Sequence, residues 1–324
     1  MSDAVVPHKA ETSPQGTGFS SESWMGRATG SDLFYSFRRS RITMIAGAVT
    51  VLFFLLAIFA SVLAVQDPFD PAQLQLINSR IPPLWEADGQ MPYLLGTDEQ
   101  GRDMLSAILF GLRISLVVGL LGVLFSGALG IVLGLVAGYV GGAVDSLIMR
   151  IADVQLTFPA ILIALLVNGV VKSVFGNRLD AMSMLAVLVF AIGLSFWVQY
   201  ARTVRGSVLV EKNKDYVAAA QLIGLPAPVI MLRHVLPNTT GPVLVIATIN
   251  LALAIITEAT LSFLGVGLPD TMPSLGTLIR IGNNYLFAGE WWIVAFPGLT
   301  LAVLILSINL LGDWLRDALN PKLR

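Results

Sequence analysis

The chain has 324 residues, of which 55% are hydrophobic and only 13% are charged, and its mean hydropathy is +0.77. A soluble domain of this size carries about a quarter charged residues, so the composition predicts an integral membrane protein. A net charge of −1 argues against nucleic-acid binding. The absence of cysteine excludes disulfides and thiolate metal sites, and His8 and His234 lie too far apart to suggest a metal site.

Six uncharged apolar runs are long enough to cross a bilayer, which takes about 20 residues. We therefore predict an all-α membrane protein with six transmembrane helices, the second of them overlong. Most lysines and arginines lie at the two ends of the chain, near Arg150 and in the segment after the fourth run. The positive-inside rule places these parts, and both termini, in the cytoplasm. The runs are residues 42–65, 114–144, 154–171, 181–201, 235–257 and 291–312.

The first third of the chain divides into two parts. Residues 1–31 are rich in Ser, Gly, Thr and Pro and predict a disordered cytoplasmic tail. Residues 32–112 predict an amphipathic segment, the first transmembrane helix and an outer loop. That loop closes with Leu-Gly-Thr-Asp-Glu-Gln-Gly-Arg-Asp at 95–103, where Thr97 or Asp98 can cap the next helix and Arg102 favours a local ion-pair cluster. We expect this motif to brace the second helix rather than to contact a substrate.

Residues 113–317 predict a five-helix core, followed by a short cytoplasmic tail at 318–324. The second run carries four glycines at four-residue spacing, a stripe that lets another helix approach closely. Pro159 and Pro297 predict kinks in the third and sixth helices. The glycines are Gly130, Gly134, Gly138 and Gly142.

Between the fourth and fifth runs, residues 213–238 form a partly charged amphipathic segment. Asn213 can cap a short helix, and Asp215 in its first turn suits the helix dipole. Gly224 then ends this helix, and a second one starts near Pro226, continues through Ile230 to Leu236 and stops at Pro237. Two short helices that meet at a glycine form an elbow. An apolar face with little bulk, open to another protein's surface, is made by Tyr216, Ala219, Ala220 and Ile223.

The elbow has the pattern Ala219-Ala220, three residues, Gly224, nine residues, then His234-Val-Leu-Pro237. This pattern resembles the signature loop of ABC importer permeases, and the 95–103 motif resembles the dipeptide/oligopeptide/nickel subfamily. The chain departs from the family at Ala218, where many such permeases have a glutamate, and at Leu275, where the subfamily often has a tryptophan.

The resemblance implies the type I ABC importer permease fold in the bacterial cytoplasmic (inner) membrane. It also implies a non-catalytic subunit of the second-permease type, with di- or oligopeptides as substrates. Partners would be a second permease, two ATPase subunits and an extracytoplasmic substrate-binding protein, with Mg-ATP held by the ATPases and no cofactor in this chain. The sequence itself has no G-x-x-x-x-G-K-[ST] phosphate loop. The resemblance assigns ATPase docking and coupling to Asp215, Tyr216, Ala219, Ala220, Gly224, Ile230, Leu236 and Pro237.

Glu258 is a carboxylate among apolar neighbours, and an intramembrane acid is a functional candidate by default. It can line the pathway, or it can be held by hydrogen bonds in a structural role. As a proton carrier it would serve a secondary transporter driven by an ion gradient, which is one alternative function. An importer of nickel or another small solute is a second, and a membrane scaffold without transport is a third.

Overall fold

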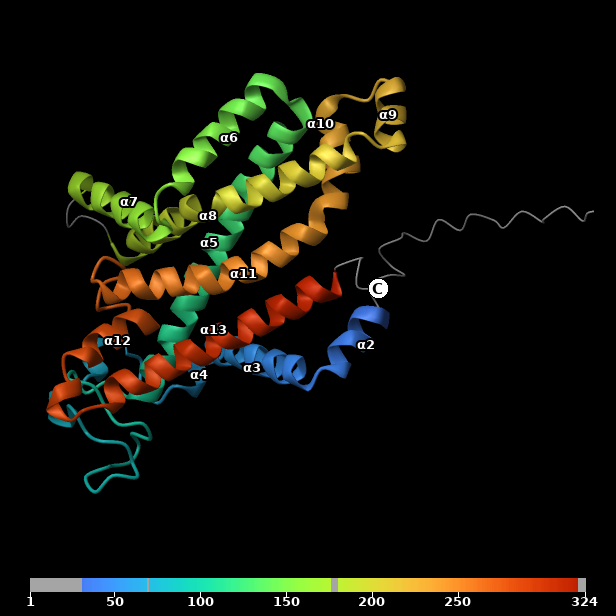
Figure 1. Cartoon of the computed structure of the whole chain (residues 1–324). Helices are drawn as coiled ribbons and strands as arrows, with labels where there is room; N and C mark the ends of the chain where they lie inside the picture. The colour runs from blue at the N-terminus through green and yellow to red at the C-terminus, as the bar shows by residue number, and fades with distance from the viewer. Residues whose placement is uncertain (1–30, 69, 176–179, 320–324) are drawn as a thin grey trace, which may run out of the picture.

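The computed structural model describes residues 31–68, 70–175 and 180–319, and within them it shows a bundle of long helices (Figure 1). Among these residues, five helical stretches are long and apolar enough to span a membrane, and the number is six if one bent helix pair is taken as a single span. The predicted tail at 1–31 lies outside the described residues except for Ser31, as does most of 318–324. The five stretches are Arg41–Ile58, Met104–Val140, Ala181–Glu211, Ala227–Phe263 and Trp292–Ala318.

The N-terminal helices α2 (Ser31–Arg39) and α3 (Arg41–Ile58) meet at Ser40, whose side chain accepts a hydrogen bond from the Thr43 N–H and so caps α3. The predicted first span to residue 65 is broken near Phe59, and the short α4 (Ala60–Leu63) follows. The freed carbonyls are satisfied by Arg113, whose Nε and Nη2 donate to the Ala57 and Ile58 carbonyls at 2.7 and 2.9 Å.

The helix α5 (Met104–Val140) packs along α8 (Ala181–Glu211) through its glycines. A Cβ on Gly130 or Gly134 would lie 2.4 Å from a backbone carbonyl oxygen of α8, and one on Gly138 would lie 2.8 Å from Val208. The prediction for Gly142 is wrong. It lies beyond α5, at φ +58° as the first residue of α6 (Gly142–Leu156), with open space around its Cβ position.

The predicted third span is not one straight helix. The α6 helix ends at Leu156, and α7 (Ala160–Phe175) begins after Pro159 at an angle of 93° to it. Proline disfavours helical geometry at the residue before it, so Phe158 separates the two helices. Pro159 therefore marks a break rather than a kink.

In the last part of the chain, a run of helix from α10 (Ala227–Ile230) through a π-helical turn (Met231–Val235) and α11 (Leu236–Phe263) precedes α12 (Leu275–Asn283) and α13 (Trp292–Ala318). Of these helices, α11 and α13 cross α5 (Figure 1). Pro297 lies inside α13, which continues through it. Single turns of 3-10 helix lie at Pro71–Gln73, Leu76–Asn78 and Leu286–Ala288.

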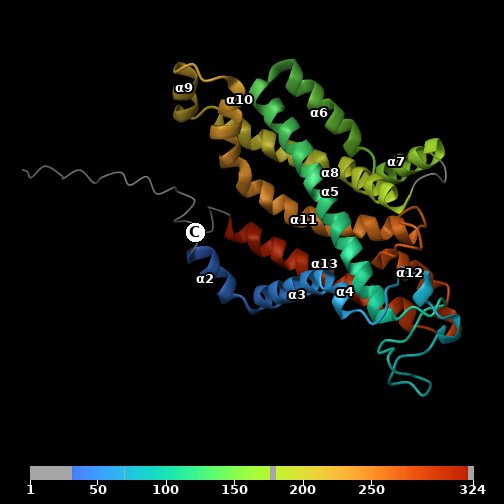
Figure 2. The ribbon, with the colours of Figure 1, turned by 180° about the vertical axis from the view of Figure 1, so that it is seen from behind.

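The two ends of the bundle differ in character. In both views α2, the end of α13, α9 (Asp215–Leu222) and α10 lie toward one side of the molecule, and the 64–103 loop lies at the other (Figures 1 and 2). One apolar core joins α3, α5, α11, α12 and α13, and a second joins α5, α7, α8 and α11. The elbow thus projects from the end of α8 and α11.

Candidate functional site

The elbow is a compact unit attached to α5 and α8. The chain leaves α8 at Glu211, forms α9, turns at Gly224 with φ +79°, and re-enters helix at α10. Because that φ is in the left-handed region, glycine suits the turn. The inner face of the elbow packs on α5 and α8 through Leu135, Val204, Val208, Val217, Ala220, Ile230 and Val235.

The predicted docking residues divide between two faces. Asp215, Tyr216, Ala219 and Gly224 are exposed, and Leu236 and Pro237 are partly buried. Ala220 and Ile230 are only 4% and 1% exposed, so they hold the elbow to the bundle and do not form its outer surface. The apolar face predicted for the first helix therefore contains one residue that points inward.

The most prominent outer residues of the elbow are Ile223, which sequence reasoning placed on the apolar face, and Leu222, which it did not single out. Leu222 is 88% exposed and Ile223 76% exposed, side by side at the end of α9 next to Gly224. Two bulky apolar side chains held in solvent are costly in an isolated subunit and are typical of an interaction site. The signal was a pair of large aliphatic residues directly before a helix-ending glycine.

Polar contacts brace the elbow across its base. The Tyr216 hydroxyl donates to Glu211 Oε2 at 2.5 Å, and Lys214 Nζ lies 2.6 Å from Glu211 Oε1. The Asn238 amide donates to Tyr216 Oη at 3.1 Å and to the His234 carbonyl at 2.8 Å. Burial, and then the bond to Glu211, raise the pKa of Tyr216 to about 12, so its hydroxyl stays a donor at neutral pH. This brace ties the end of α8 to α9 and α11.

Two predicted helix boundaries are wrong. Asn213 does not cap α9: its amide donates to the Leu209 carbonyl at 2.9 Å, and Lys214 is the N-cap residue. Pro237 does not stop the second helix, because it lies in the first turn of α11, where a missing N–H is tolerated. The turn before it widens instead, and the Leu236 N–H donates to the Met231 carbonyl.

Glu258 is fully buried between α5, α11 and α12. Its Oε2 accepts a hydrogen bond from Ser115 at 2.8 Å and its Oε1 one from Ser262 at 2.7 Å. Ser115 in turn accepts from the Leu275 N–H at the start of α12. Both carboxyl oxygens are thus occupied by local hydroxyls, an arrangement that joins three helices. We propose a structural role for Glu258.

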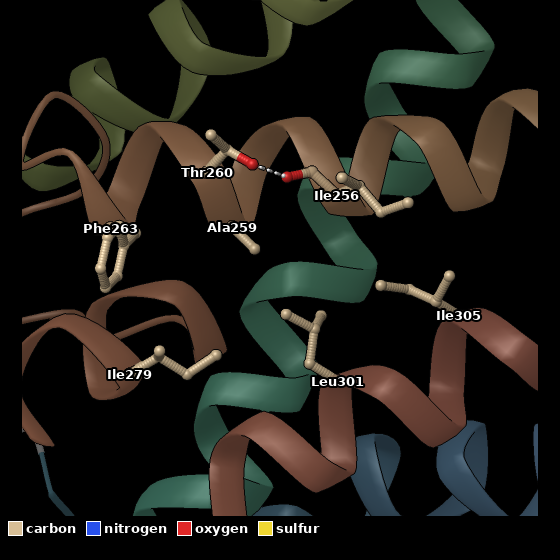
Figure 3. Close-up of a pocket in the computed structure, with 7 residues that line it drawn as sticks. All are labelled: Ile256, Ala259, Thr260, Phe263, Ile279, Leu301 and Ile305. Atoms are coloured by element: carbon tan, nitrogen blue, oxygen red, sulfur yellow. Dashed lines mark hydrogen bonds between the residues drawn. The ribbon is translucent and has the colours of Figure 1, made fainter. Parts of the chain in front are cut away.

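The structure has an apolar groove of about 280 Å³ (Figure 3). Some of its lining residues are sequence neighbours of Glu258, but Glu258 itself does not line it. Thr260 contributes the lone hydroxyl, which donates to the Ile256 carbonyl of its own helix at 2.8 Å. With no free polar group, the groove does not suit a hydrophilic solute. It lies between α11, α12 and α13 and is lined by Ile256, Ala259, Thr260, Phe263, Ile279, Leu301 and Ile305.

The 95–103 motif forms the predicted ion-pair cluster at the other end of the bundle. Arg102 Nε lies 2.7 Å from Asp98 Oδ2, and both side chains are buried. Arg102 also donates to the Asp270 carbonyl in the loop before α12 at 3.2 Å. The cap of α5 is neither Thr97 nor Asp98: it is Asp103, which accepts from the Ser106 N–H at 2.8 Å.

The chain matches two protein families. Residues 130–324 match the family described as the binding-protein-dependent transport system inner membrane component. Residues 30–83 match the N-terminal transmembrane domain of oligopeptide transport permease C. The chain belongs to this permease family. It is therefore a multi-pass, non-catalytic membrane component of an ABC transport system, which confirms the predicted class and replaces the gradient-driven and scaffold alternatives.

Relatives of known name match most of the chain. The di/tripeptide transport system permease protein DppC of Pseudomonas aeruginosa (strain UCBPP-PA14) is 38% identical over 85% of this chain and 87% of its own. The dipeptide transport system permease protein DppC of Escherichia coli (strain K12) is 38% identical over 90% and 93%. An inward-facing MetNI methionine ABC transporter chain is similar in fold, with a TM-score of 0.53 and 17% identity over 67% of this chain. The predicted importer permease fold is confirmed.

Proposed function

We propose that the chain is the second-type permease of a bacterial ABC importer for di- or oligopeptides. It would lie in the cytoplasmic membrane with both termini and the elbow in the cytoplasm. The path would run between this chain and a related permease, and an extracytoplasmic protein would deliver the substrate. The support is the similarity to relatives named as dipeptide and di/tripeptide permeases over about nine-tenths of their length.

The elbow carries the mechanistic part of the proposal. Its outer surface offers Leu222 and Ile223 to an ATPase subunit, and its inner face is fixed to α5 and α8. When two ATPases close on Mg-ATP, they would move the elbow as one body. The Glu211–Tyr216–Asn238 brace would then transmit the motion to α8 and α11, the helices that flank α5.

Purification of the tagged chain from its own membrane tests this proposal. We expect a second permease and ATPase subunits to co-purify. Vesicles holding the complex, with the binding protein outside, should take up a labelled dipeptide only when ATP is inside. Uptake driven by membrane potential without ATP would contradict the proposal. Uptake of Ni²⁺ unaffected by excess dipeptide would replace peptides with nickel as the substrate.

Gly224 allows the coupling role to be tested without removing the elbow. Gly224→Trp puts a large side chain at a positive-φ turn on the outer surface, so the protein should insert normally while transport and substrate-stimulated ATP hydrolysis fall to background. Gly224→Asn is the matched control, because asparagine tolerates positive φ and adds little bulk. We expect near-normal transport from it. Retained coupling in Gly224→Trp would show that ATPases do not dock here.

A further inference from the structure

A second groove, of about 360 Å³, lies between α6, α7 and α8. Of these helices, α6 and α7 lie at the edge of the bundle in both ribbon views (Figures 1 and 2). Its walls are aliphatic and aromatic, with Arg150 at one end. Gln155 adds an amide, but Nε2 donates to the Leu194 carbonyl at 2.5 Å and Oε1 accepts from Trp197 Nε1 at 2.7 Å. The lining residues are Arg150, Ile151, Val154, Gln155, Phe158, Ile163 and Leu194.

Arg150 differs from its basic neighbours on α8. Arg205 pairs with Asp145, with Nη2 2.7 Å from Oδ2, and Arg202 pairs with Asp153. Arg150 is exposed, and within residues 31–68, 70–175 and 180–319 no hydrogen bond or ion pair reaches its guanidinium. It is thus an available cation at the end of an apolar groove.

The paired residues show where this cation lies relative to the membrane. The uncharged part of α8 runs over residues 181–201 and ends at Arg202, so the Arg202–Asp153 pair marks the boundary on the elbow side. Arg150 lies three residues before Asp153, toward the start of α6. Phe158 and Ile163 follow Asp153, and Leu194 lies within the uncharged part of α8. The groove therefore extends from headgroup level into the hydrocarbon region.

We propose that this groove binds an anionic phospholipid of the elbow-side leaflet, with its phosphate on Arg150 and one acyl chain between Val154, Phe158 and Leu194. The charge decides the class of ligand, because an unpaired guanidinium matches a phosphate and the remaining lining offers nothing to a polar solute. Since α8 also carries the base of the elbow, a bound lipid would contact a helix that moves with the elbow.

The test uses the intact transporter complex in detergent, titrated with phosphatidylglycerol or phosphatidylcholine and measured by native mass spectrometry. We expect phosphatidylglycerol to remain bound and Arg150→Gln to weaken its retention about fivefold, the effect of one charge near a membrane surface. Arg316→Gln is the matched control, an exposed arginine on α13 outside the groove, and should leave retention unchanged. The proposal would be overturned if Arg150→Gln and Arg316→Gln retained phosphatidylglycerol equally, either both at the unmodified level or both at the same reduced level.

A photoactivatable acyl chain on phosphatidylglycerol locates the site. We expect the label on the peptide that spans 151–163, and less of it in Val154→Trp, which fills the groove while keeping Arg150. Label confined to other helices would overturn the proposal. So would cross-links from this groove to the second permease, which would show that a protein covers it.

Discussion

Arg102 and Asp98 illustrate how a few residues fix the end of the bundle opposite the elbow. Both side chains are buried, and Arg102 Nε lies 2.7 Å from Asp98 Oδ2. Asp98 Oδ1 also accepts hydrogen bonds from the backbone N–H groups of Gln100 and Arg102. The ion pair thus holds both the loop at 95–103 and, through the Asp270 carbonyl, the loop before α12. Removing one partner leaves a buried charge without compensation.

We therefore predict that Arg102→Leu destabilises the folded protein by about 3–5 kcal/mol, the usual effect of breaking a buried pair from one side. Adding Asp98→Asn to that variant should recover part of the loss, because the unpaired carboxylate is gone. Thermal unfolding of both variants in detergent measures this. A double variant no more stable than Arg102→Leu would show that the pair is not the source of the effect.

Glu99 gives the same loop a pH dependence. Burial first, and then repulsion by Asp98, raise the pKa of Glu99 above its ordinary value of 4.5. Ionisation therefore favours the unfolded chain: the stability contributed by Glu99 is fully present below pH 4.5 and is lost as pH rises through the raised pKa. Glu99→Gln removes this dependence.

The expected readout is the difference in melting temperature between Glu99→Gln and the unmodified protein. The melting temperature of Glu99→Gln, relative to that of the unmodified protein, should increase from pH 4 to pH 7.5. Any pH-independent effect of the amide cancels in this comparison. Asp180→Asn is a suitable control, because its bond to Ser183 lowers the pKa of Asp180 below the ordinary value of 3.8, so its difference in melting temperature should stay nearly constant from pH 4 to pH 7.5. A constant difference across this range would contradict the account of Glu99.

At the scale of elements, the close contact between α5 and α8 holds the bundle together. Gly134→Leu would press a side chain into the Ala201 carbonyl, and backbone cannot move aside as a flexible side chain can. We predict a loss of about 3 kcal/mol or more, or failure to accumulate in the membrane. Gly206→Ala, on α8 with nothing within 4 Å of its Cβ position, should be neutral or slightly stabilising. Equal behaviour of the two variants would show that the contact is not tight.

The hydropathy of the sequence predicted the long helices, because a helix that spans a bilayer needs a long uncharged apolar run. It did not predict the 93° bend at Pro159, because residues 154–171 are apolar on both sides of that break. The inward position of Ala220 and Ile230 follows from contacts with α5 and α8, which no local pattern specifies. The cap at Asp103 was missed because Thr97 and Asp98 have equally suitable side chains, and Thr97 is used by the Ile81 N–H and the Asn78 carbonyl.

At the scale of the whole molecule, the proposal rests on a division between two ends. The elbow with its exposed Leu222 and Ile223 lies at one end, and the 64–103 loop lies at the other, together with the segment between α12 and α13 that contains the exposed Phe287. If the elbow receives an ATPase, motion generated on one side of the membrane reaches the helices through α8 and α11. The chain contains no cysteine, so single cysteines report position without background.

The most direct measurement is site-specific cross-linking of the assembled transporter in membranes. Ile223→Cys with a thiol-directed photo-cross-linker should form a product with the ATPase subunit. Phe287→Cys, 97% exposed at the opposite end, should form none. This result would establish that the elbow is the docking surface. A cross-link between Phe287→Cys and the ATPase would contradict this docking role for the elbow. So would the absence of a cross-link from both variants in a complex that still hydrolyses ATP on substrate addition.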